Sequence, residues 1–72
     1  MKVYIVEAHS YDEDHRLAVC ASIDKAKEIL KDTAEELIAD DDRNIDWDAD
    51  GLGFYDDMEG YRYVIVTAEV IE

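Results

Sequence analysis

Residues 22–39 have the sequence SIDKAKEILKDTAEELIA, in which apolar side chains recur at helical spacing. They form a single stripe along a helix, made of Ile23, Ala26, Ile29, Leu30, Ala34, Leu37 and Ile38. Ser22 is a favourable N-cap, because its hydroxyl oxygen accepts a hydrogen bond from an N–H of the first turn that lacks a helical partner. The pattern therefore predicts one amphipathic helix from about residue 22 to residue 39.

Segments typical of strands lie on both sides of this helix. Residues 3–6 and 16–21 are apolar and precede it, and residues 61–71 follow it with a period of two. We predict a further short strand at residues 44–47. The order β-β-α-β-β gives an α+β fold, in which one amphipathic helix packs on one face of a small antiparallel β-sheet. Residues 1–72 then form a single domain.

The predicted sheet has two apolar faces and only one helix to cover them. In the first strand, Tyr4 and Val6 alternate with Val3 and Ile5, so neither face is polar. An exposed apolar face of this kind needs a cover. Two covers are open at this point: a second copy of the chain in a homodimer, or the apolar residues of the acidic segment 40–60, which are Trp47, Leu52, Phe54 and Tyr55.

Acidic residues dominate the charge of the chain. The sequence contains 20 Asp and Glu residues against 7 Lys and Arg residues, which gives a formal net charge of −13. This charge excludes electrostatic attraction to a nucleic-acid backbone or to an anionic membrane, so we expect direct binding to neither. No apolar run reaches the length of a membrane span, and the N-terminus is unlike a secretory signal. With a single cysteine, these features predict a cytoplasmic protein.

The charges of the predicted helix oppose the helix dipole. Lysines lie in the first half of the helix and Asp32, Glu35 and Glu36 in the second, whereas the dipole favours the reverse. Like charges also stand four residues apart, as Glu28 and Asp32 do, and such pairs destabilise a helix. The arrangement therefore does not serve helix stability. The acidic half continues as one negative surface into Asp40, Asp41 and Asp42.

We interpret this surface as an imitation of a nucleic-acid backbone that occupies a basic, nucleic-acid-binding surface of another protein. Duplex DNA carries one charge per about 1.7 Å, and the segment 40–60 places carboxylates densely among aromatic side chains suited to an interface. The predicted partner-binding residues are Asp32, Glu35, Glu36, Asp40, Asp41, Asp42, Trp47, Phe54, Tyr55, Asp56, Asp57 and Glu59.

In size, charge and compact build, the chain resembles the small acidic inhibitors that phages use against restriction and CRISPR nucleases. The resemblance implies an inhibitor of a host defence or nucleic-acid-processing protein, acting in the host cytoplasm, and it assigns no role to any residue. The alternatives are a solvated acidic surface that maintains solubility, the acidic composition of a halophile, and a regulatory or scaffold domain.

Residues 46–57, DWDADGLGFYDD, match the pattern D-x-D-x-D-G with an acidic residue at position 12 and resemble the EF-hand calcium loop. The resemblance implies calcium as a cofactor, with ligands from Asp46, Asp48, Asp50, Asp57 and the Leu52 carbonyl. The shorter side chain of Asp57 replaces the usual Glu, and a strand follows where an EF-hand has a helix. A turn-prone acidic loop is therefore the competing interpretation.

Residues capable of catalysis are not arranged as in an active site. Cys20 lies in an apolar strand, where we predict a buried structural thiol. His9 and His15 flank an acidic loop without the close spacing of a zinc site. A chain of 72 residues also offers little concave volume for a substrate. The expected function is therefore non-enzymatic protein binding.

Overall fold

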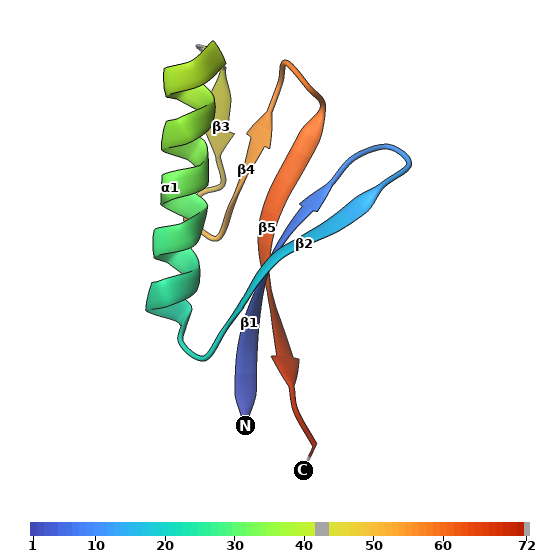
Figure 1. Ribbon diagram of the computed structural model, residues 1–72, viewed down its shortest axis with the longest axis vertical. Coiled ribbons are helices and arrows are strands. Elements are labelled where there is room, and N and C mark those ends of the chain that lie inside the picture. Colours follow the sequence, from blue (N-terminus) through green and yellow to red (C-terminus); the bar gives the residue numbers. More distant parts are fainter. Residues whose placement is uncertain (42–43, 72) are drawn as a thin grey trace.

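The computed structural model describes residues 1–41 and 44–71. In chain order, these residues form β1 (Lys2–His9), β2 (Asp14–Cys20), α1 (Ile23–Asp41), β3 (Ile45–Trp47), β4 (Gly53–Asp56) and β5 (Tyr61–Glu69). The strands make one antiparallel sheet in the order β2-β1-β5-β4-β3, and α1 packs on one face of it (Figure 1). The predicted α+β fold with a single packed helix is confirmed. No helix in the described part of the chain has the length and apolarity to cross a membrane.

The helix begins where its capping residue predicts. Ser22 Oγ accepts a 3.2 Å hydrogen bond from the backbone N–H of Lys25, and the Ser22 carbonyl accepts one from Ala26. The apolar stripe turns toward the sheet, and Ala26, Leu30 and Ala34 are buried along it. The helix extends to Asp41, two residues beyond the predicted end.

The core lies between α1 and the centre of the sheet. Leu30 of the helix is fully buried against a cluster that includes Val6 of β1, Cys20 of β2 and Phe54 of β4. Cys20 is a free, buried cysteine, as its apolar surroundings in the sequence predict. The rings of Phe54 and Tyr63 stack with their centroids 4.6 Å apart, which joins β4 to β5 on the helix side of the sheet.

A β-bulge changes the character of β2 midway along the strand. Val6 of β1 pairs with Ala18, but the next residue, Glu7, pairs with Arg16, so Leu17 is the extra residue. On the C-terminal side of the bulge, Ala18 and Cys20 face the helix. On its N-terminal side, the strand residues Asp14, His15 and Arg16 are charged or polar. Beyond the bulge, Arg16 pairs with Glu7 and Asp14 pairs with His9, so the charged end of β2 lies beside the polar end of β1.

The segment between α1 and β5 extends the sheet instead of covering its second face. Residues 45–47 form the predicted short strand, and β4, which the sequence does not predict, pairs with both β3 and β5. Phe54 points into the core on the helix side, so the interpretation of this segment as a cover for the second face is wrong.

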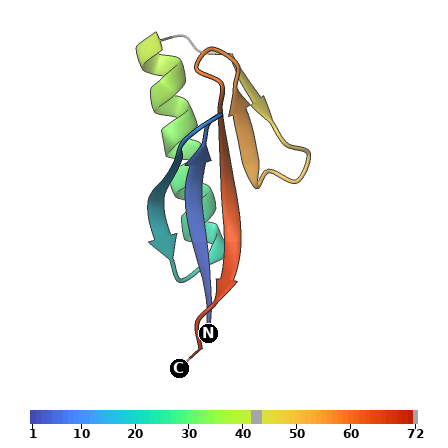
Figure 2. The same cartoon turned by 90° about the vertical axis from the view of Figure 1, so that its right-hand side faces the viewer.

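The face opposite α1 is open in the described chain. Figure 2 shows this open face toward the viewer, with α1 behind the sheet. Register and alternation place on it the following apolar residues of three adjacent strands: Val3 and Ile5 of β1, Val19 of β2, and Val64, Val66 and Ala68 of β5. Val19 is 55% and Val66 39% exposed.

The buried stripe of α1 gives a direct test of this packing. We expect Leu30→Ala to lower the free energy of unfolding by about 2–5 kcal/mol, because it leaves a cavity in the core. Ile38→Ala is the matched control on the same helix, since Ile38, although part of the predicted stripe, is 45% exposed, and it should change stability by about 0.5 kcal/mol. Urea denaturation followed by circular dichroism measures both. Equal stability of the Leu30→Ala variant and the parent would contradict the described core.

Candidate acidic binding surface

The predicted carboxylates that are exposed lie along the C-terminal half of α1 and in the β4–β5 turn. We call Asp32, Glu35, Glu36 and Asp40 of α1 and Asp57 and Glu59 of the β4–β5 turn the acidic end; all six residues are exposed. Figure 1 shows the C-terminal end of α1 and the β4–β5 turn at the same end of the molecule. The N–H of Asp57 donates a 3.3 Å hydrogen bond to the carbonyl of Asn44, which joins the turn to the segment that follows the helix.

Two further predicted carboxylates belong to the same stretch of sequence. Asp41 is the last residue of α1, and Asp42 follows it. The side chain of Asp41 and the whole of Asp42 lie outside the described residues, so neither is counted in the acidic end.

The carboxylates of α1 form a column whose mean charge density along the helix axis is close to that of phosphates along one DNA strand. Asp32, Glu36 and Asp40 stand four residues apart, and Glu35 lies beside them. By helix geometry, these four side chains span about 12 Å along the axis and an arc of about 140°. They therefore present one charge per about 4 Å, compared with about 3.4 Å per phosphate along one strand of duplex DNA.

The column is not neutralised by neighbouring cations in the described structure. The four carboxylates of α1 in the acidic end form no ion pair among the described residues, and the ion pair of Lys25 with Glu28, at 3.5 Å, lies in the other half of the helix. The last turn of α1 contains no basic residue. Like-charge pairs four residues apart and acids near the negative end of the dipole each destabilise the helix by about 0.2–1 kcal/mol. The acidic end is thus maintained at the expense of helix stability.

The predicted aromatic residues do not form one surface. Phe54 is fully buried and belongs to the core, so it does not join a binding surface. Trp47, which is 42% exposed, packs on the helix side with its ring centroid 5.0 Å from that of Phe54. Tyr55 pairs across the strands with Asp46 and Arg62, and it projects from the open face. Trp47 and Tyr55 therefore lie on opposite faces of the sheet.

Asp56 is also buried and shapes the β4–β5 turn from within. Its Oδ1 accepts a 3.1 Å hydrogen bond from the N–H of Met58, and its carbonyl accepts one of 2.9 Å from Gly60. Gly60 has a φ of 73°, a conformation that glycine adopts without steric cost. Asp56 therefore supports the turn that presents Asp57 and Glu59 and, being buried, is not part of the exposed surface.

The five residues of the calcium pattern are not brought together around one point. Asp48 and Asp50 lie in the β3–β4 turn, but β4 is an extended strand, which puts about 13 Å between this turn and Asp57. The Leu52 carbonyl accepts a 3.0 Å hydrogen bond from the N–H of Ile65, and Asp46 lies within β3. Among the described residues, no group of three or more His, Cys, Asp or Glu side chains is arranged to hold a metal ion.

Residues of the calcium pattern instead build a hairpin turn. Asp50 Oδ1 accepts a 2.9 Å hydrogen bond from the N–H of Leu52, and Asp48 Oδ2 forms a 2.7 Å ion pair with Arg62 of β5. Gly53 makes this contact feasible, because a Cβ there would lie 2.8 Å from Asp48 Oδ2 and from the Tyr63 carbonyl. The Asp48–Arg62 pair joins the turn to β5 and is not foreseen from the sequence, since the two residues are distant along the chain.

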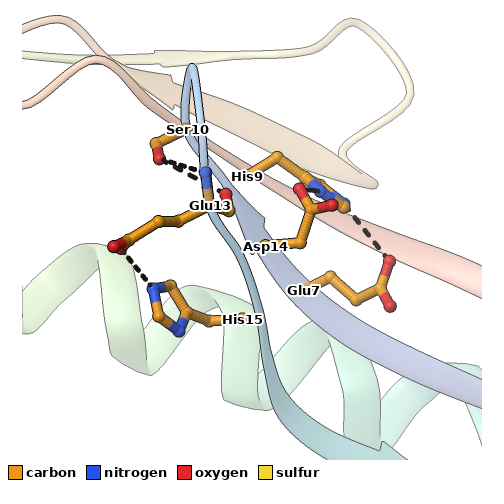
Figure 3. A network of polar contacts seen from close by, with 6 residues as sticks. All are labelled: Glu7, His9, Ser10, Glu13, Asp14 and His15. Atoms are coloured by element: carbon orange, nitrogen blue, oxygen red, sulfur yellow. Dashed lines mark hydrogen bonds and ion pairs between the residues drawn. The ribbon is translucent and has the colours of Figure 1, made fainter.

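Figure 3 shows a second polar cluster, at the β1–β2 hairpin. His9 Nδ1 lies 2.5 Å from Asp14 Oδ1, and its Nε2 lies 3.2 Å from Glu7 Oε1. Because both ring nitrogens face carboxylate oxygens, the doubly protonated imidazolium satisfies both contacts and the neutral ring satisfies only one. The hydrogen bond to Asp14 and the charges of Asp14 and Glu7 raise the pKa of His9 above 6.5, against a smaller lowering by burial.

The two histidines of this hairpin do not share a site. His15 Nε2 lies 3.0 Å from Glu13 Oε2, and its ring is 6.4 Å from that of Tyr61 on the helix side of the sheet. His9 lies on the open face, so the two rings point to opposite sides of the sheet. The described part of the chain forms no pocket.

Comparison with known protein families, curated proteins and solved structures finds no match to this chain.

The carboxylate pair around His9 predicts a pH dependence with a definite sign. Because the folded-state pKa of His9 is raised, its contribution to stability is complete below about pH 6.5 and is lost as pH rises through the folded pKa. An NMR titration of the His9 ring should give a pKa above 6.5, and Asp14→Asn should lower it. Asp12→Asn, which removes a nearby exposed carboxylate outside the cluster, should leave it unchanged. A pKa of His9 at or below 6.5 in the parent would contradict the cluster.

Proposed function

We propose that this protein is a non-enzymatic, cytoplasmic inhibitor that mimics nucleic acid and blocks a basic, nucleic-acid-binding surface of another protein through its acidic end. The observation that carries the proposal is the carboxylate column of α1, whose mean charge density along the helix axis is close to that of one DNA strand. A groove that binds phosphates has cationic side chains at a comparable mean density. The proposed partner is therefore a host defence or nucleic-acid-processing protein with such a groove.

The charge distribution along the molecule supports a directional encounter. Lys25 and Lys27 lie near the N-terminal end of α1, while the acidic end lies at the opposite end of the helix (Figure 1). By helix rise, Lys25 and Asp40 are about 22 Å apart along the axis, which exceeds a Debye length of about 8–10 Å, although Lys31 directly precedes Asp32. A cationic surface consequently attracts the acidic end first, and the association is fast and salt-sensitive.

The instability built into the acidic end supports the same proposal. Acids at the C-terminal end of a helix and a column of like charges both oppose folding. A cationic partner removes this repulsion when it binds, so the arrangement becomes favourable in the complex. A carboxylate surface that serves only solubility does not require this placement, because exposed positions elsewhere give the same net charge at a smaller cost in stability.

Neutralisation of the acidic end tests the proposal. The parent protein, immobilised, is used to capture partners from a lysate at low and high salt, and each captured protein is assayed for binding to a labelled DNA or RNA duplex. We expect the protein to compete with the duplex. The triple variant Glu35→Gln, Glu36→Gln and Asp40→Asn should associate at least about tenfold more slowly with little change in dissociation.

A variant with the same change in net charge is the control. Asp12→Asn, Asp46→Asn and Glu69→Gln also remove three negative charges, but from exposed positions outside the acidic end. This control should retain most of the association rate. A ternary complex of partner, protein and duplex with unchanged affinities would refute the mimicry. Equal effects of the two triple variants would show that net charge alone acts, as expected for a solvated acidic surface.

A further inference from the structure

The open face of the sheet is apolar in one half and charged in the other. Its apolar half consists of Val3, Ile5, Val19, Val64, Val66 and Ala68 on β1, β2 and β5. These residues are contiguous on three hydrogen-bonded strands, and β-branched side chains of this kind interdigitate when two sheets pack face to face. No segment of the described chain covers this half (Figure 2).

The open face carries only a small part of the negative charge of the chain. Its charged half has four carboxylates, of Glu7, Asp14, Asp46 and Asp48, and two guanidinium groups, of Arg16 and Arg62. The formal charge of the open face is therefore −2, out of −13 for the whole chain. Both described arginines lie on this face, whereas all four lysines of the chain lie elsewhere.

This charge pattern determines which occupant fits the face. A basic partner is attracted most strongly to a surface of large negative charge, whereas this face has a formal charge of only −2 and contains charges of both signs. A second copy presents the same mixed charges, so its carboxylates can meet the guanidinium groups of the first copy and the reverse. An approach of two copies through their acidic ends would instead bring two surfaces of high negative charge together.

We propose that two copies of this chain associate through their open faces as a two-fold symmetric dimer. A two-fold axis parallel to the strands packs the two apolar halves together and sets the two charged halves against each other, so that carboxylates of one copy can meet guanidinium groups of the other, while each α1 stays on the outer side of its own sheet. The dimer leaves both acidic ends accessible, so this inference goes beyond the proposed function and does not rest on it.

Sedimentation equilibrium over a range of concentrations tests the dimer. The mass should rise from 8.3 kDa to twice that value with concentration, and added salt should favour the dimer by screening repulsion between the copies. Salt weakens the proposed binding to a basic partner, so the opposite responses separate the two proposals. The variant Val19→Thr with Val66→Thr, which keeps β-branched side chains and net charge, should weaken self-association at least tenfold while circular dichroism shows an unchanged fold.

Ile38→Thr is the control, since Ile38 is exposed to a similar extent on α1, away from the open face. It should leave self-association unchanged. A monomer at every concentration and salt would overturn the proposal, as would a dimer that persists in the variant Val19→Thr with Val66→Thr or is lost in Ile38→Thr.

Discussion

One helix can cover only one face of a sheet, and the arrangement of this protein follows from that constraint. The apolar stripe around Leu30 packs on the helix side of β1, β2 and β5, and it determines which side chains of each strand are buried. The other side chains of the same strands are left on an uncovered face. The described residues contain no second helix that could shield these side chains. The same constraint leaves the outer side of α1 free to carry charge.

The two exposed surfaces of the molecule are chemically different, which suggests separate uses. The outer side of α1 holds carboxylates that form no ion pair among the described residues, and the β4–β5 turn adds two more exposed carboxylates. The open face holds apolar residues and charges of both signs. A surface of a single sign suits a partner of opposite sign, and an apolar surface of small net charge suits a copy of itself. The two proposals therefore assign different partners to different faces, and neither surface obstructs the other.

The sequence predicts the local structure well and the tertiary relations less well. Ser22 marks the start of α1, and the stripe from Ala26 to Ala34 faces the core as helical spacing indicates. Strand β4 is missed, because its four residues lie in a stretch of Asp and Gly that is typical of a turn or a calcium loop.

In the candidate surface too, features that depend on local spacing are predictable and features that depend on tertiary contacts are not. Helical spacing alone places the carboxylates of α1 on one side, so this part of the surface is foreseen. The burial of Phe54 and Asp56 depends on their pairing with Tyr63 and Tyr61 of β5, which is a long-range register that no local pattern specifies. For the same reason, the Asp48–Arg62 pair and the carboxylates around His9 become visible only in the folded chain.

The account rests on the claim that the carboxylate column is held against the stability of its own helix. Glu36 is the central test, since it stands four residues from both Asp32 and Asp40. In urea denaturation at low salt, Glu36→Gln should raise the free energy of unfolding by about 0.4–1 kcal/mol, because it removes two like-charge pairs. The gain should shrink as salt is added and should exceed that of Glu69→Gln, an exposed position outside the helix. A Glu36→Gln variant no more stable than the parent would contradict the account.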